Sequence, residues 1–275
     1  MKIIDIDKLF DEFIKDYVYG NIGKVKPEEI ENQIPKLYEK FGNTPLDKLG
    51  GKTPNEYYLS FSSKELVMGL ETHIKNNVSV SDFIIEALVI KGEDSDLIAK
   101  LNEEENEELL IYLINILKDK NSKDASKSVL NFVLYDYSET LRELCAEFLY
   151  DHADEVKEQI LLEFNNCKNE VKECLTDILS HASKDDKVFD ILMLEFEKNP
   201  KKLALYAGFI CRYGDERALP FLLEAIERDK ISYADFEELR FAIESLGGSY
   251  DKKRNFTADK TYKKIKGEKI KNLKV

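Results

Sequence analysis

Apolar residues recur at helical spacing along the second half of this chain. Three segments, 156–164, 188–196 and 218–226, align with one another at offsets of 32 and 30 residues. In each segment the first, fifth and ninth positions are apolar, which is typical of one face of a helix. A second helical pattern accompanies each segment, at 141–149, 173–182, 204–214 and 238–248. The spacing predicts helix pairs that recur every 30 to 34 residues.

A helix pair of this length cannot bury its apolar face alone, so neighbouring pairs must stack around a shared core. We therefore expect an all-α chain, built as a right-handed α-solenoid of antiparallel helix pairs over 61–248, clearest over 120–248. Residues 1–60 are expected to form a divergent helical N-terminal cap, because an array needs polar ends. Further helices are expected to begin at Pro27 and to cover about 62–76, 79–90 and 102–118. The pattern leaves the repeat boundaries before residue 120 undefined.

The last helix pair resembles the bacterial HEAT repeat, including the short type first noted in phycobilisome lyases. The repeat's pattern begins with Gly-Asp-x-Arg-Ala-x-Pro-x-Leu and ends in an alanine-rich helix that closes on Leu-Gly. The matching residues are Gly214, Asp215, Arg217, Ala218, Pro220, Leu222, Ala242, Leu246 and Gly247. The match is strong here, fair over 138–214, and fades towards the N-terminus. The resemblance implies structural roles for the matched residues: Asp215 and Arg217 tie turns together, and Pro220 shapes the first helix.

Composition supports a folded chain and excludes several classes of protein. Hydrophobic residues make up 43% and charged residues 35% of the 275 residues, which indicates a globular rather than a disordered protein. The longest apolar run, 109–117, contains Tyr112 and Asn115 and is too short to span a membrane. The N-terminal MKIIDIDKLF carries acids where a signal peptide needs a basic start. We therefore expect a cytoplasmic protein.

Charge divides the chain into an acidic body and a basic C-terminal tail. Residues 251–275 hold ten Lys/Arg and three Asp/Glu, a net charge of +7, which leaves −20 on residues 1–250. An acidic body repels phosphate backbones, so nucleic acid is an unfavourable partner. The tail, 249–275, also contains apolar residues. It could fray or bind anions nonspecifically, but we favour docking against acidic surface, on this body or on a partner.

No pattern indicates a catalytic, cofactor or metal site. The four cysteines form no CxxC pair, the three histidines are scattered, and no HExxH is present. The acids of 103–108 fit a solvated helix start. Gly51-Lys52-Thr53 imitates the end of a phosphate loop, but Leu46 stands where the loop needs a glycine. We expect instead a capped helix start, with Thr53 as N-cap, Pro54 at the first helical position, and Glu56 completing a capping box.

Two classes of function remain. We favour a non-enzymatic protein-protein interaction or scaffold module, which binds an unidentified protein or peptide on the concave face of the array. Aligning the second helices puts Thr176, Tyr206 and Arg240 in one row, with Ser180 and Glu244 a turn further along; Arg240 and Glu244 should be exposed. The alternative is an enzyme on a HEAT-like scaffold, such as a bilin lyase or a DNA-alkylation glycosylase. A glycosylase needs a basic groove with aromatic walls, whereas this body is acidic and the chain has no Trp.

The absence of phosphate-loop and metal motifs has a direct test. Equilibrium dialysis against zinc, and against ATP with magnesium, should show no stoichiometric uptake below millimolar concentrations. Tight ATP binding that disappears in Lys52→Ala would contradict the interpretation of this segment as a helix cap.

Overall fold

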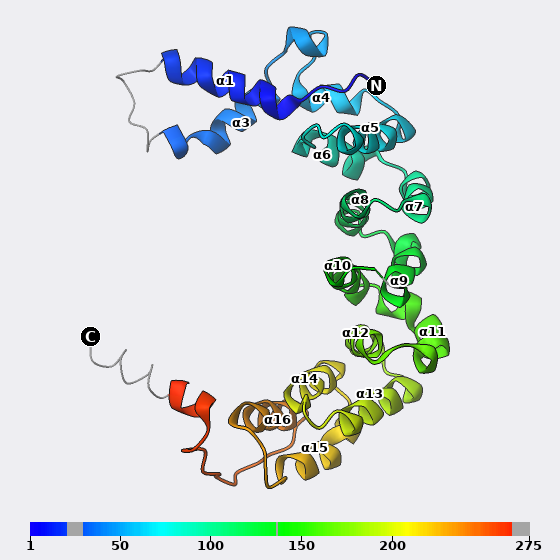
Figure 1. Ribbon diagram of the computed structural model, residues 1–275, viewed down its shortest axis with the longest axis vertical. Helices are drawn as coiled ribbons and strands as arrows, with labels where there is room; N and C mark the ends of the chain where they lie inside the picture. The colour runs from blue at the N-terminus through cyan, green and yellow to red at the C-terminus, as the bar shows by residue number, and fades with distance from the viewer. Residues whose placement is uncertain (21–29, 136, 266–275) are drawn as a thin grey trace, which may run out of the picture. The chain divides into compact units, whose positions relative to one another are not determined.

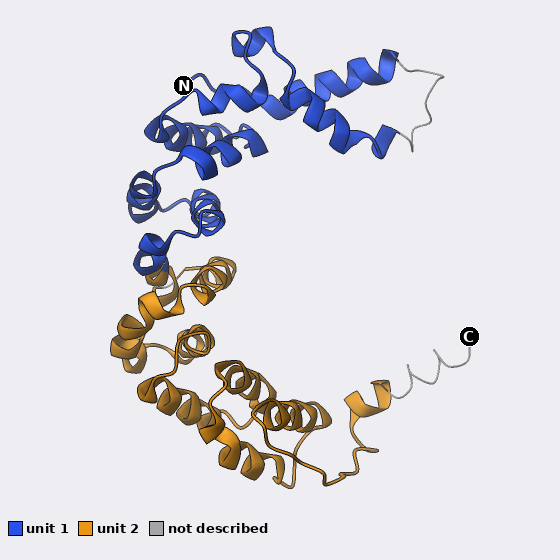
Figure 2. Cartoon of the chain, turned by 180° about the vertical axis from the view of Figure 1, so that it is seen from behind, with its two compact units in different colours: residues 1–129 blue, residues 130–275 orange. Residues whose placement is uncertain are grey.

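The computed structural model describes residues 1–20, 30–135 and 137–265 (Figure 1). These residues form an all-α fold; a lone bridge between Leu46 and Lys52 is the only β-pairing among them. The chain divides into two compact units, Met1–Val129 and Leu130–Val275 (Figure 2). In both units helices pack mostly against near neighbours in sequence, as in a helical array. The boundary between these units differs in kind from the two boundaries expected from the sequence, which separate the N-terminal cap near residue 60 and the tail near residue 248 from the repeats. Those two boundaries stay predictions.

The first unit contains a short helical hairpin followed by a series of helices. The aromatic rings of Phe10 on α1, Tyr38 and Phe41 on α3, and Phe83 on α6 pack together, with neighbouring ring centroids 4.9 to 6.1 Å apart. This cluster joins the hairpin to the helices that follow it. The helices are α1 (Ile6–Gly20), α3 (Ile34–Gly42), α4 (Pro54–Leu59), α5 (Ser63–Lys75), α6 (Asp82–Lys91), α7 (Asp94–Glu103) and α8 (Glu107–Asp119), with 3-10 turns at Asp47–Leu49 and Lys123–Ala125.

The expected helices of this unit are confirmed in part. Helices α5 and α6 match the expected ranges within a few residues, and the expected start at Pro27 lies outside the described residues. The expected single helix over 102–118 is wrong, because residues 102 and 103 end α7 and a new helix starts at Glu107. The break has a local cause: the Asn106 side chain accepts the Leu109 N–H at 3.1 Å and so caps α8.

The Gly-Gly-Lys-Thr segment forms a turn followed by a capped helix. Gly50 and Gly51 have φ of +68° and +81°, a left-handed conformation that favours glycine. Thr53 Oγ1 accepts the Glu56 N–H at 3.2 Å, and the Glu56 carboxylate accepts the Thr53 N–H at 3.1 Å. The expected capping box is therefore confirmed, and the two glycines are explained by the turn.

The second unit is a two-layer stack of helices. Helices α10, α12, α14 and α16 pack side by side and form one layer. Helices α11, α13 and α15 form the second layer, which packs against the first (Figure 1). Helix α9 contains the boundary between the units. The bounds are α9 (Ser126–Leu134), α10 (Glu139–Tyr150), α11 (Ala153–Glu163), α12 (Asn169–Leu179), α13 (Asp186–Lys198), α14 (Leu203–Tyr213), α15 (Leu219–Ile226) and α16 (Tyr233–Ser245), with 3-10 turns at Phe164–Asn166 and Glu216–Ala218.

The aligned apolar positions of the three matching segments form the core between the two layers. All nine are at most 2% exposed. Burying a Val, Leu, Ile or Phe side chain, the type found at eight of these positions, contributes about 1.5–3 kcal/mol relative to leaving it in water. The positions are Val156, Ile160, Phe164, Val188, Leu192, Phe196, Ala218, Leu222 and Ile226.

The described part of the basic tail packs against its own unit. Lys252 forms an ion pair with Glu227, and the Arg254 guanidinium donates to the carbonyls of Ile226 and Arg228, both at 2.8 Å. These carbonyls lie at the end of α15, where a cation also complements the helix dipole. Phe256 packs against the rings of Tyr233 and Phe236 at the start of α16. The described tail residues thus contact their own unit through one carboxylate, two backbone carbonyls and aromatic rings, and docking on a broader acidic surface stays a prediction.

Two glycines of the second unit test whether the left-handed turn after α16 requires glycine: Gly247 lies in that turn, and Gly208 lies inside a helix. Gly247 has φ +85°, and the Gly248 N–H closes the helix on the Ile243 carbonyl at 2.9 Å. Gly247→Ala should lower the free energy of unfolding by about 1 kcal/mol, or about 2–4 °C in Tm, because Ala is strained there. Gly208 lies inside α14 with no atom within 4 Å of an added Cβ, so Gly208→Ala should raise Tm. Thermal unfolding followed by circular dichroism measures both, and equal shifts of one sign would contradict the assignment.

Candidate functional site

An open groove of about 770 Å³ crosses α10, α12 and α14 in the second unit. Ala146, Leu205 and Phe209 supply apolar surface to it. Leu205 is 39% exposed, whereas Phe209 is 4% exposed and forms part of the floor. The other lining residues are Glu139, Arg142, Glu143, Glu147, Tyr150, Glu170, Glu173, Cys174, Asp177 and Lys202.

Most of the polar residues that line the groove are carboxylates. They form two stripes, one along α10 and one along α12, because residues three or four positions apart lie on the same face of a helix. Glu139, Glu143 and Glu147 stand four residues apart on α10, and Glu170, Glu173 and Asp177 follow the same period on α12. Like charges four residues apart lower helix stability by about 0.2–0.5 kcal/mol per pair. Glu139 and Glu170 stand in the first turns of their helices, where the dipole favours an acid, so the repulsion concerns the residues further along each stripe.

Some of these carboxylates are neutralised within the unit. Lys202 forms an ion pair with Glu173, and Arg212 forms one with Asp177. Glu139, Glu143 and Glu170 have no hydrogen bond or ion pair to their side chains among the described residues. The groove thus presents uncompensated negative charge.

A polar cluster fixes the α12 wall of the groove. The Tyr150 hydroxyl donates to Asp177 Oδ2 at 2.6 Å, and its ring stacks on His181 with centroids 4.2 Å apart. Burial, reinforced by the bond to Asp177, raises the pKa of Tyr150, so the phenol stays a hydrogen-bond donor. Burial, with a smaller contribution from Arg212, lowers the pKa of His181. The cluster holds Asp177 in place.

The thiol in the groove is unsuited to nucleophilic chemistry. Burial raises the pKa of Cys174 to about 12, and nearby Asp177 acts in the same direction. A thiol nucleophile needs a lowered pKa, because the thiolate is the reactive form. Burial therefore favours the protonated, less nucleophilic form of this thiol.

Three of the five residues expected on the binding face lie inside the fold. Thr176, Ser180 and Tyr206 are at most 2% exposed. The Thr176 hydroxyl donates to the Lys172 carbonyl at 2.6 Å, and Ser180 Oγ accepts from Arg212 at 2.8 Å. Burial raises the pKa of Tyr206 to about 12. These three side chains are therefore buried and not available on an open face, and on α12 the solvent face carries Glu170, Glu173 and Asp177 instead.

The other two expected residues lie on α16, outside the groove. Glu244 is exposed, as expected, and Arg240 is partly buried. Arg240 lies 2.9 Å from Glu237 and 3.8 Å from Glu244, so it forms ion pairs along its own helix. The sequence pattern did not predict the groove, although the spacing of Glu139, Glu143 and Glu147 indicates one acidic stripe.

The residues matched to the repeat pattern make the contacts expected of structural residues. The Arg217 guanidinium binds both oxygens of Asp215, at 2.7 to 3.1 Å, and reaches Asp186 at the start of α13 at 2.7 Å. It also lies 4.3 Å above the Phe189 ring. Gly214 ends α14 with φ +72°, and Pro220 lies in the first turn of α15. These contacts join one helix pair to the next.

Comparisons with known protein families, with curated proteins and with solved structures find no match. Within residues 1–20, 30–135 and 137–265, no three His, Cys, Asp or Glu side chains are placed to hold a metal ion. No helix in these ranges has the length and apolar character needed to cross a bilayer. The function is therefore argued from the groove itself.

The pair of Asp215 and Arg217 predicts a pH dependence of stability. The bonds from Arg217 lower the pKa of Asp215 below its usual 3.8. A lowered pKa in the folded state stabilises the fold above pH 3.8, and this contribution is lost as pH falls through the lowered value. Asp215→Asn should cost about 1 kcal/mol at pH 7, because a charge-assisted contact is lost, and should reduce the loss of Tm below pH 4. Melting curves from pH 7 to pH 2 test this, and parallel curves for variant and wild type would refute it.

Proposed function

We propose that this chain is a non-enzymatic protein-binding module of HEAT-like repeats that holds a basic segment of a partner protein in the groove of α10, α12 and α14. The observation that carries the proposal is the pair of carboxylate stripes on one open groove. Stacked helix pairs leave one layer free for partners, and this layer carries the groove. A negatively charged groove selects cationic ligands and repels nucleic-acid phosphates.

Apolar and charged surface act together in this proposal. Lys and Arg side chains can lay their aliphatic stems on the exposed Leu205 while their charged ends meet the carboxylates. Each exposed ion pair contributes about 0.2–1 kcal/mol, so several are needed for measurable affinity. Long-range attraction also raises the association rate. We expect affinities in the micromolar range, which corresponds to about −8 kcal/mol.

The test is an array of short synthetic peptides of basic, neutral and acidic composition, probed with the full chain. Wild type should favour the basic peptides, and the preference should weaken as salt rises, because salt screens exposed charges. The groove variant Glu139→Gln, Glu143→Gln, Glu170→Gln should lose at least about ten-fold in affinity, the equivalent of about 1.4 kcal/mol.

The matched control variant removes three negative charges, as the groove variant does, but from the layer of α11, α13 and α15. Glu158, Glu197 and Glu224 are exposed on α11, α13 and α15, and their triple change to Gln should leave the affinity for basic peptides close to that of wild type. An array without preference for basic peptides, or equal losses in the groove and control variants, would refute the proposed function.

A further inference from the structure

In the part of the chain that the structure describes, Arg142 of α10 has no carboxylate partner, although acids line the same groove. Among the described residues, its Nε is buried without a hydrogen-bond partner, and its Nη2 donates to the Tyr137 carbonyl at a long 3.4 Å. No described Asp or Glu lies within ion-pair distance of it. A guanidinium is a rigid fork of donors that matches a carboxylate, so an Arg held in this way has unused binding capacity.

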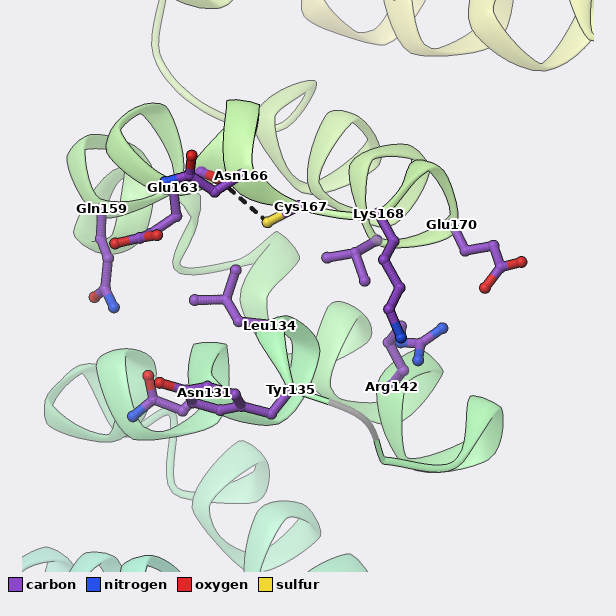
Figure 3. A pocket seen from close by; sticks show the side chains of 11 residues that line it. Asn131, Leu134, Tyr135, Arg142, Gln159, Glu163, Asn166, Cys167, Lys168 and Glu170 are labelled. Carbon is purple, nitrogen blue, oxygen red and sulfur yellow. Dashed lines mark hydrogen bonds between the residues drawn. The ribbon is translucent and has the colours of Figure 1, made fainter.

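This guanidinium stands in the wall between the groove and a smaller pocket of about 310 Å³. Figure 3 shows Lys168, from the start of α12, reaching towards Arg142 at one end of this pocket. The Glu163 carboxylate lies at the other end, beside Gln159, and Glu170 points outward (Figure 3). The positive charges of the pocket, Arg142 and Lys168, therefore lie at the end that adjoins the groove, and the negative charge of Glu163 lies at the opposite end.

The rest of the pocket suits the end of a peptide. The carboxamides of Asn131, Gln159 and Asn166 line it and can pair with the N–H and C=O groups of a bound main chain. Helix α12 begins at its edge, with Lys168 as an N-cap that provides no side-chain acceptor, so its positive dipole end adds to the two cations. Leu134 and Val171 supply apolar surface.

We infer that the partner segment ends in this pocket, with its C-terminal carboxylate on Arg142 and Lys168 and its basic residues in the adjoining groove. The inference rests on the proposed function, because the groove supplies the second half of the surface. A terminal carboxylate fits better than an Asp or Glu side chain, because the pocket also offers carboxamides for the last peptide groups. The two neighbouring sites of opposite charge thereby fix the direction of the bound chain.

The probe is a fluorescein-labelled pool of short random Lys/Arg-rich peptides, prepared with a free C-terminal carboxylate or with a C-terminal amide. Fluorescence anisotropy with the full chain should show about ten-fold tighter binding of the free-acid pool. Arg142→Gln should abolish this difference between the free-acid and amidated pools, and Arg142→Lys should restore only part of it, because Lys lacks the planar fork. Lys187→Gln, an equal charge change at an exposed site on α13, should leave the difference intact.

The comparison of the free-acid and amidated pools on wild type does not depend on any variant. If Arg142 variants fold poorly, Lys168→Gln should reduce the difference in affinity between the two pools. Equal binding of the two pools, including no binding of either, overturns the inference. An amidated pool with one internal Glu that binds as tightly as the free-acid pool also overturns it. The proposed function fails separately, when the peptide array shows no preference for basic sequences.

Discussion

Shared burial of an apolar stripe between the two helix layers is the constraint on which the second unit depends. Val156, Val188 and Ala218 occupy equivalent positions in successive pairs, and none of them is exposed. A pair of short helices cannot exclude water from such residues on both sides, so each pair needs its neighbours. The stacking of pairs is therefore the condition for folding of each pair.

Polar contacts set how one pair meets the next. Arg217 joins Asp215 to Asp186 and covers Phe189, while Asp154 accepts the Ser183 N–H at 3.0 Å and Asp235 accepts the Ala204 N–H at 3.1 Å. Each contact places a carboxylate against a neighbouring pair. Because apolar burial has no preferred direction, such directional bonds fix the spacing of the helices.

Once packing holds the helices, their outer faces are free to carry charge that would weaken an isolated helix. Glu139 and Glu143 of α10 illustrate this, because these like charges stand four residues apart and form no ion pair among the described residues. Natural sequences depart from local preferences most often at functional sites. The buried Nε of Arg142, which has no hydrogen-bond partner among the described residues, is a second departure of this kind.

The sequence by itself determined the all-α class, the core positions of 156–226 and the capped start at Thr53, because these follow from local periodicity and local hydrogen bonding. It did not determine which side chains of the second helices are exposed: Thr176 and Tyr206 look like surface positions when the segments are aligned by spacing, but they are buried. Which side of a helix meets a neighbour depends on how the helices rotate to pack, and no single segment encodes this. Only the tertiary structure brought Arg142, Lys168 and the two acidic stripes around adjoining cavities, because they lie on separate helices and meet through packing.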